Sequence, residues 1–325
     1  MSKATKTAFV CTECGSEHPK WQGQCQDCKQ WNTLVEFRPG PAKASKGASS
    51  RKGPAAAPQI QKLDEVDLQE SPRLTTHISE LDRVLGGGLV PGSALLLGGQ
   101  PGAGKSTLLL QAICKLAQDN EVLYVTGEES LQQVAMRADR LGIKTTGVNM
   151  LSETSVETIL SASEGNTPKI LVIDSIQVMH VDDVESAPGS VSQVRESAAA
   201  LIQFAKRTNT ILFMIGHVTK EGSLAGPKVL EHMIDASLLL EDTDDSRYRT
   251  LRGIKNRFGA VNELGIFAML ENGLREVKNP SAIFLNRSVD QASGSVVMVI
   301  WEGTRPLRVE IQALVDDAQG GTPRR

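Results

Sequence analysis

The sequence predicts an α/β fold in which a parallel sheet carries a phosphate-binding loop and a small four-cysteine module precedes it. Three observations predict it: a complete phosphate-loop motif at 99–106, apolar runs alternating with helical patterns from about residue 60, and two Cys-x-x-Cys pairs near the N-terminus. The 325 residues suffice for two or three domains, and 40% hydrophobic with 22% charged residues is ordinary for a globular protein. A net charge of −3 excludes a uniformly basic nucleic-acid coat and leaves local basic patches open.

The phosphate loop reads Gly-Gln-Pro-Gly-Ala-Gly-Lys-Ser, preceded by an apolar run at 94–97 and followed by helix-forming residues. Strand, loop and helix therefore come in the order that the motif requires. Its glycines let backbone N–H groups converge on phosphates at a helix N-terminus, where the helix dipole also favours an anion. We expect ATP here, with Lys105 at the β and γ phosphates and Ser106 as a ligand of Mg²⁺. The predicted nucleotide contacts are Gly99, Gln100, Pro101, Gly102, Ala103, Gly104, Lys105, Ser106 and Thr107.

Three further apolar runs, at 124–125, 170–173 and 211–215, indicate buried strands of the same sheet. Because ligands of open parallel sheets bind at the carboxyl ends of the strands, the polar residues that follow these runs are site candidates. Asp174 is the expected Walker B carboxylate that holds Mg²⁺, and a helix cap is its structural alternative.

The other two strand ends supply a catalytic base and a candidate sensor. Glu128 is expected to orient the attacking water. Its neighbour Glu129 is the residue most easily confused with it. Because adjacent strand residues point to opposite faces, only one of the two is expected to reach the nucleotide. His217 could sense the nucleotide state, and a histidine satisfied by local backbone is the alternative.

The N-terminal cysteines have the spacing of a tetrahedral metal site. Cys11-x2-Cys14 and Cys25-x2-Cys28 direct four thiolates at one centre, which favours structural Zn²⁺ with no open coordination position. Disulfides and an iron–sulfur cluster are the alternatives, and disulfides suit a chain without a secretion signal less well. We thus predict a zinc finger at 1–37.

Three other features near these motifs have simpler interpretations. Trp21 and Trp31 are expected to cover the small core of the finger, with stacking on bases as the open alternative. Cys114 is expected to be a small buried residue. The segment 38–59 predicts a flexible basic linker, because Pro, Gly, Ala and Ser surround Arg38, Lys43, Lys46, Arg51 and Lys52 without an acidic residue before position 58.

Together with the finger and the phosphate loop, the pentapeptide Lys255-Asn256-Arg257-Phe258-Gly259 resembles the bacterial RadA (Sms) family of DNA-repair ATPases. Further matching stretches lie at 127–130, 217–222 and 225–232. The resemblance implies a RecA-like ATPase core at 60–278 that forms hexameric rings and binds single-stranded DNA in the channel. It also implies branch migration of recombination intermediates in cooperation with the RecA recombinase.

The resemblance also suggests roles for basic residues beyond the phosphate loop. It implies that Lys255 and Arg257 act on the nucleotide of a neighbouring subunit, like an arginine finger, whereas the alternative is a solvated basic hairpin. Two connections would face the ring axis: a structureless, acidic one at 179–193, and one at 219–231 in which Lys220 and Lys228 are the expected contacts with DNA phosphates.

The segment 279–325 resembles only the opening strands of a Lon-protease-like domain, so the chain looks like a truncated form or a naturally short variant. No run approaches 18 apolar residues and the N-terminus lacks the apolar core of a signal peptide, which predicts a cytoplasmic protein without a membrane partner. The leading hypothesis is a DNA-dependent ATPase motor. A KaiC-like nucleotide-switched scaffold and a zinc-tethered adaptor without motor activity are the alternatives.

Overall fold

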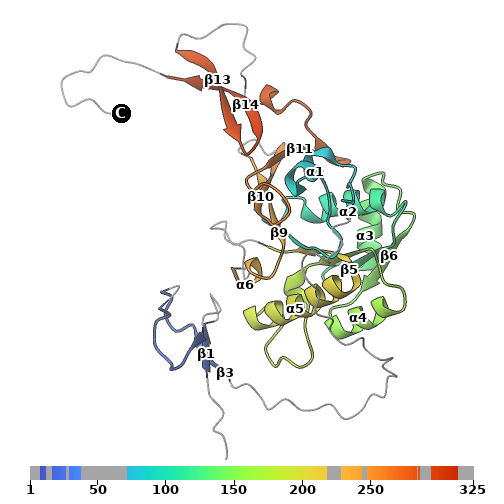
Figure 1. Ribbon diagram of the computed structural model, residues 1–325, viewed down its shortest axis with the longest axis vertical. Coiled ribbons are helices and arrows are strands. Elements are labelled where there is room, and N and C mark those ends of the chain that lie inside the picture. The colour runs from blue at the N-terminus through green and yellow to red at the C-terminus, as the bar shows by residue number, and fades with distance from the viewer. Residues whose placement is uncertain are drawn as a thin grey trace, which may run out of the picture.

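The computed structural model describes residues 8–11, 17–26, 29–37, 72–217, 228–243, 247–283, 285 and 294–313. Within them, a nine-stranded sheet has the order β12-β11-β10-β9-β4-β8-β7-β5-β6 (Figure 1). The strands from β9 to β6 in this order run parallel. Four of them lie at the predicted apolar runs: β4 Ala94–Gly99, β5 Val122–Thr126, β7 Ile170–Asp174 and β8 Ile211–Ile215. The other two, β6 Val148–Ser152 and β9 Ala236–Asp242, were not predicted. Three antiparallel strands that the sequence analysis did not predict extend one edge: β10 Tyr248–Asn256, β11 Leu264–Leu270 and β12 Gly273–Glu276.

Helices cover both faces of this sheet because its central strands are apolar on both sides. Along β4, Leu95 and Leu97 pack into one core, whereas Ala94 and Leu96 pack into the other. The first core includes residues of α1 (Ser79–Leu85), α2 (Lys105–Leu116) and α3 (Leu131–Arg140). The second core includes residues of α4 (Val156–Glu164) and α5 (Val191–Thr208), which lie on the opposite side of the sheet in Figure 1.

The connection after β7 begins with the short 3-10 helix η2 (Ile176–Val178). Residues 179–190 form no helix or strand, as predicted, whereas 191–193, the end of the predicted connection, already belong to α5. Gln193, a buried residue in the first turn of α5, ties the loop down: its Oε1 accepts from Val181 N at 3.0 Å, and its Nε2 donates to Val184 O at 2.9 Å and Ser186 O at 3.0 Å. One buried amide thus satisfies backbone groups that the loop would otherwise leave unpaired.

The N-terminal module is a three-stranded antiparallel sheet of β1 (Ala8–Cys11), β2 (Glu17–His18) and β3 (Leu34–Phe37), in the order β2-β1-β3. Its core consists of Cys11, Cys25 and Leu34 with Phe9 beside them. The prediction that the tryptophans cover this core is wrong: Trp21 is 57% exposed and Trp31 is 68% exposed. In the described part of the module the core is filled by Cys11, Cys25, Leu34 and Phe9 instead.

A hairpin of β13 (Ser295–Glu302) and β14 (Arg305–Gln312) follows the core. Leu307 packs against Leu264 and Ile266 of β11, and Arg305 forms a buried ion pair with Glu80 of α1 at 2.5 Å. Two short elements complete the described structure, α6 (Lys228–Glu231) and η3 (Pro280–Ala282). Among the described helices, none is both long enough and apolar enough to traverse a lipid bilayer.

Candidate nucleotide-binding site

The phosphate loop joins β4 to α2, and its glycines are required by geometry. A Cβ at Gly99 would lie 2.4 Å from the Leu240 carbonyl oxygen of the neighbouring strand β9, so only glycine allows the two backbones to approach. Gly104, the residue before α2, has φ +101°, and Gly102 has φ +84° with no atom within 4 Å of its Cβ position. The loop therefore presents backbone to an open space at the N-terminus of α2, which is the cradle that a phosphate chain needs.

Lys105 lies under this loop with only 5% of its surface exposed. Its Nζ donates to the carbonyl oxygens of Gly99 at 2.8 Å and Gln100 at 2.9 Å. Burial lowers the pKa of Lys105, and the charges of Asp174 and Glu128 act in the opposite direction. The ammonium is thus held at the loop by groups that an anionic ligand can replace. Ser106 and Thr107 follow it in the first turn of α2, half-buried.

Asp174 ends β7, next to β5 in the sheet. Its Oδ2 accepts a hydrogen bond from the hydroxyl of Tyr124, which lies on β5 and is completely buried. Burial, followed by the charge of Asp174 and the hydrogen bond to it, raises the pKa of Tyr124 well above its ordinary value. The raised pKa favours the protonated hydroxyl, which donates to Asp174 and orients the carboxylate that is expected to hold Mg²⁺.

The two adjacent glutamates after β5 point in different directions. Glu128 accepts a hydrogen bond from the hydroxyl of Ser175, and its Oε1 lies 3.6 Å from Nε2 of His217. Nδ1 of His217 lies 3.3 Å from Nζ of Lys105, so this histidine bridges the candidate base and the phosphate-loop lysine. Glu129 instead forms an ion pair with Arg137 of α3. Of the two carboxylates, only that of Glu128 faces the loop.

The antiparallel extension supports the phosphate loop through residues that the sequence analysis missed. Arg249, a buried residue at the start of β10, donates from Nε to the carbonyl oxygen of Ala103 at 3.2 Å and pairs with Asp242 at 2.9 Å. Gln111 of α2 bonds both the N–H and the carbonyl of Leu274 in β12. These partners are 146 and 163 residues apart in the chain, and no local motif marks them.

Lys255 and Arg257 lie far from the phosphate loop of their own chain. Lys255 pairs with Ser237 near the amino end of β9, whereas Gly99 pairs with Leu240 further along the same strand. Asn256, between the two cations, pairs with Ala236, four residues and about 13 Å from Leu240. The basic pair therefore lies at the amino ends of the parallel strands, opposite to the phosphate loop at their carboxyl ends. The structure does not bring it to the other predicted residues of the nucleotide site.

Both cations are held by the turn before β9. Nζ of Lys255 donates to the carbonyl oxygens of Glu231 and Ile234, the latter at 2.7 Å. Arg257 pairs with the buried Asp235 at 3.1 Å and is half-exposed. Burial, and then the neighbouring charge of Arg257, lower the pKa of Lys255.

Four of the predicted site residues lie wholly or partly outside the described part of the chain. Lys220 lies outside the described residues, and Lys228 begins α6 with its side chain outside them. Of the predicted zinc ligands, Cys14 and Cys28 also lie outside. Cys11 and Cys25 are completely buried in one cluster, and Nε2 of His18 lies 3.5 Å from Sγ of Cys25. Two thiols converging in a core this small suit the donor set of a zinc site. Cys114 is buried as predicted, which raises its pKa to about 11.

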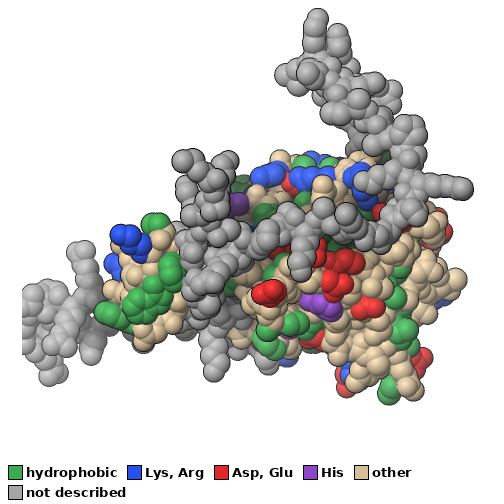
Figure 2. All heavy atoms as spheres, turned by 90° about the horizontal axis from the view of Figure 1, so that it is seen from below, with side chains coloured by type: hydrophobic (Ala, Val, Ile, Leu, Met, Phe, Trp, Pro, Cys, Tyr) green, Lys and Arg blue, Asp and Glu red, His purple; other side chains and the backbone are tan. Residues whose placement is uncertain are grey.

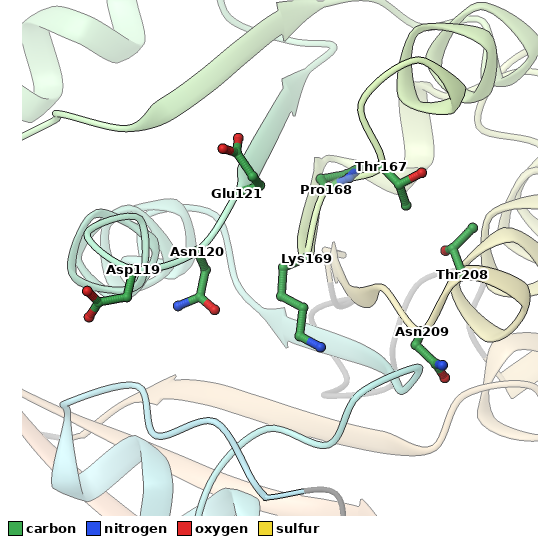
Figure 3. A pocket seen from close by; sticks show the side chains of 8 residues that line it. All are labelled: Asp119, Asn120, Glu121, Thr167, Pro168, Lys169, Thr208 and Asn209. Carbon is green, nitrogen blue, oxygen red and sulfur yellow. The ribbon is translucent and has the colours of Figure 1, made fainter.

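A hollow of about 440 Å³ lies at the amino ends of the parallel strands (Figure 3). Its walls come from the segments that immediately precede β5, β7 and β8, and Lys169 and Glu121 stand on them. Because nucleotides bind at the carboxyl ends of such strands, this hollow at their amino ends is separate from the phosphate-loop site.

The comparisons with known proteins agree with this geometry. A family model described as an AAA domain matches residues 58–223, and one described as a rubredoxin metal binding domain matches residues 9–36. The DNA repair protein RadA of Escherichia coli K12 is 63% identical over 328 residues, which cover 100% of this chain and 71% of that protein.

Two solved structures share the fold. The RadB recombinase matches with a TM-score of 0.51 and 21% identity, covering 63% of this chain and 100% of its own. A KaiC-like protein from Pyrococcus horikoshii matches with a TM-score of 0.54 and 20% identity, covering 63% of this chain and 99% of its own. At this sequence identity the two matches show the fold alone, and they confirm the predicted RecA-like P-loop core.

Proposed function

This chain belongs to the RadA family of DNA repair proteins, and we propose that it is a DNA-dependent ATPase of recombinational repair. In this proposal the chain forms a ring, translocates on single-stranded DNA and promotes branch migration of recombination intermediates. One observation supports a motor rather than a simple nucleotide switch. The phosphate loop lies at the carboxyl ends of the parallel strands, whereas the basic pair Lys255 and Arg257 lies at their amino ends. A subunit with this arrangement offers half of a catalytic site on each side.

Within one subunit, the described side chains can perform the steps of ATP hydrolysis. Lys105 would exchange its carbonyl partners for the β and γ phosphates, and Ser106 and Asp174 would hold Mg²⁺. The metal, when bound, neutralises charge on the phosphate oxygens. Glu128, placed by Ser175 and His217, would orient the attacking water and accept its proton. His217 touches both the lysine and the base, so it can report the occupancy of the site.

The second half of the site would come from a neighbouring subunit of a hexamer. Lys255 and Arg257 stabilise the negative charge that develops on the γ phosphate, a role worth about 10³ to 10⁵ in rate in related phosphoryl transfers. Arg257 is half-exposed at the amino ends of the parallel strands, so its guanidinium is available to another copy once it leaves Asp235. A closed ring then gives each subunit one complete site.

DNA contacts fall on the segment at 219–231, where Lys220 and Lys228 are the proposed phosphate ligands. The connection after β7 is the weaker candidate because it carries Asp182, Asp183 and Glu185. Figure 2 shows acidic side chains gathered on the underside of the core, a surface that repels a phosphate backbone.

The remaining parts of the proposal concern location and partners. We place the protein in the cytoplasm, with structural Zn²⁺ in the N-terminal module and the RecA recombinase as partner at the junction. A KaiC-like switched scaffold and a zinc-tethered adaptor share the fold and the nucleotide site, but neither needs DNA to stimulate hydrolysis.

The test is ATP turnover by the full chain with and without single-stranded DNA, together with a mass measurement of the assembly. The motor predicts hexameric mass, turnover that rises with single-stranded DNA, and displacement of a paired strand during hydrolysis. DNA-independent turnover in a stable hexamer would favour the scaffold and refute the motor.

A further inference from the structure

Two tryptophans lie outside the hydrophobic core of the described part of the N-terminal module. Trp21 and Trp31 expose 57% and 68% of their surface, whereas the core beneath them consists of other residues. Exposing two large indoles in so small a module is unfavourable in water, and Trp is among the residues most enriched at binding hot spots. Figure 2 shows the module at the left, where hydrophobic side chains border Lys and Arg side chains.

The two rings belong to one surface and are held by ordered backbone. A Cβ at Gly23 would lie 3.6 Å from Cζ3 of Trp31 and 4.0 Å from Cη2 of Trp21, so both indoles border the same glycine. Gln24 and Trp31 form an antiparallel bridge, and Asn32 N donates to Gly23 O at 2.7 Å. Gly23 itself adds no side chain between the two rings.

The surroundings of the indoles are cationic and rich in amides. Lys20 and Lys29 are exposed next to them in the chain, and Asp27 is the sole acidic residue of the sequence between 18 and 35. The segment that follows the module adds five cations without an acidic residue before position 58: Arg38, Lys43, Lys46, Arg51 and Lys52. Aromatic faces beside positive charge are the chemistry by which proteins hold unpaired nucleotides.

We propose that Trp21 and Trp31 form a stacking platform for bases of single-stranded DNA, outside the ATPase core. The inference rests on the proposed function, since it takes the DNA strand of the motor as its ligand. Bases stack on the two indoles, and Lys20 and Lys29 contact the adjoining phosphates. The zinc module then anchors a strand independently of the nucleotide state, while the core moves along it.

The test compares two variants of the full chain. Trp21→Ala/Trp31→Ala removes the platform, and Trp301→Ala removes an equally exposed tryptophan, 69% exposed, from β13. Fluorescence anisotropy with a labelled oligothymidylate measures affinity, and elemental analysis checks that zinc content is unchanged. We expect the double variant to bind about 10- to 100-fold more weakly and Trp301→Ala to bind like the unmodified chain. Trp21→Phe/Trp31→Phe, which keeps two stacking rings, should restore most of the affinity.

An abasic oligonucleotide of the same length separates stacking from charge. It should bind the unmodified chain and the double variant equally, because it has phosphates and no bases. Undiminished oligothymidylate binding by a zinc-loaded double variant would overturn the platform and leave the indoles as a protein-docking surface, while DNA-stimulated hydrolysis would still stand. An unmodified chain that binds no single-stranded DNA would overturn the platform and the proposed motor together.

Discussion

Single hydrogen bonds decide which of the charged residues at the phosphate loop can act. Glu128 and Glu129 are chemically identical and adjacent, yet Ser175 and His217 hold the first at the loop whereas Arg137 draws the second onto α3. The alternation of side chains along a strand predicts that only one can face the nucleotide. Which one does so depends on Ser175 and Arg137, whose positions require the folded sheet.

Replacing each of these two glutamates by glutamine in turn provides a matched pair of variants. Glu128→Gln should lower ATP turnover by about 10² to 10⁴ while nucleotide affinity stays nearly unchanged, because an amide cannot accept the proton of water. Glu129→Gln should lower turnover by less than about fivefold, since it loses only a partly buried ion pair on α3 that does not face the phosphate loop. Steady-state turnover and fluorescent-nucleotide binding measure both effects. If Glu129→Gln were the inactive variant, the assignment of the base would be reversed.

Tyr124 is the residue that most directly controls Asp174. Tyr124→Phe removes the hydrogen bond to Oδ2 and keeps the buried ring, so the fold should remain while the carboxylate loses its orientation. A hydrogen bond to a charged group is worth about 1.5 to 3 kcal/mol, which predicts a rise of roughly tenfold or more in the Mg²⁺ concentration needed for half-maximal nucleotide binding. Binding measured with Mg²⁺ chelated should not change. An unaltered Mg²⁺ requirement would show that the tyrosine only fills space.

At the level of elements, contacts between distant segments can supply a helix cap that the local sequence lacks. Helix α1 begins after Ile78, which provides no side-chain cap. Glu276 of β12 supplies one instead: its Oε1 accepts from Ser79 Oγ at 2.6 Å and from Glu80 N at 3.0 Å. Burial acts to raise the pKa of Glu276, but the bonds from Ser79 and Glu80 outweigh it and leave this pKa below its ordinary value.

This cap predicts a pH-dependent contribution to stability. A carboxyl with a lowered pKa in the folded state stabilises the fold at pH values above its unfolded pKa, and the contribution disappears as the pH falls through the folded pKa. Glu276→Gln should therefore lower stability at neutral pH by about 1 kcal/mol and make little difference in acid. Thermal unfolding at several pH values measures this, with Glu271→Gln in the exposed turn before β12 as control. A loss that is the same at every pH would contradict the ionic cap.

The difference between local sequence patterns and contacts between distant segments explains how far the sequence could predict the structure. The phosphate loop and the apolar strands beside it are local patterns, so their positions and the parallel direction of the central strands could be predicted. The contacts of Arg249 with Ala103 and of Glu276 with α1 join segments 146 and 196 residues apart, and nothing near either residue marks them. The exposure of Trp21 and Trp31 was predicted wrongly because burial is the commoner state of tryptophan, and only the folded module shows which residues fill its core.

The whole molecule combines a rigid nucleotide-binding sheet with two attached units. The hairpin β13–β14 is joined to the core by the buried pair of Arg305 and Glu80, and by Leu307. The N-terminal module is a separate three-stranded sheet, linked through the basic segment at 38–59. The ATPase core thus lies in the chain between the N-terminal module and the hairpin β13–β14.

The central claim is that ATP is hydrolysed between subunits, and mixing two inactive variants tests it most directly. Lys105→Ala removes the phosphate-loop cation, and Arg257→Ala removes the cation at the amino ends of the parallel strands, so each alone should lose DNA-stimulated turnover. In mixed rings, some interfaces pair an intact loop with an intact Arg257. The account predicts partial recovery of turnover with single-stranded DNA in such a mixture, with mass measurement confirming that both variants share one assembly. Full activity of Arg257→Ala alone, or no recovery in demonstrably mixed rings, would contradict it.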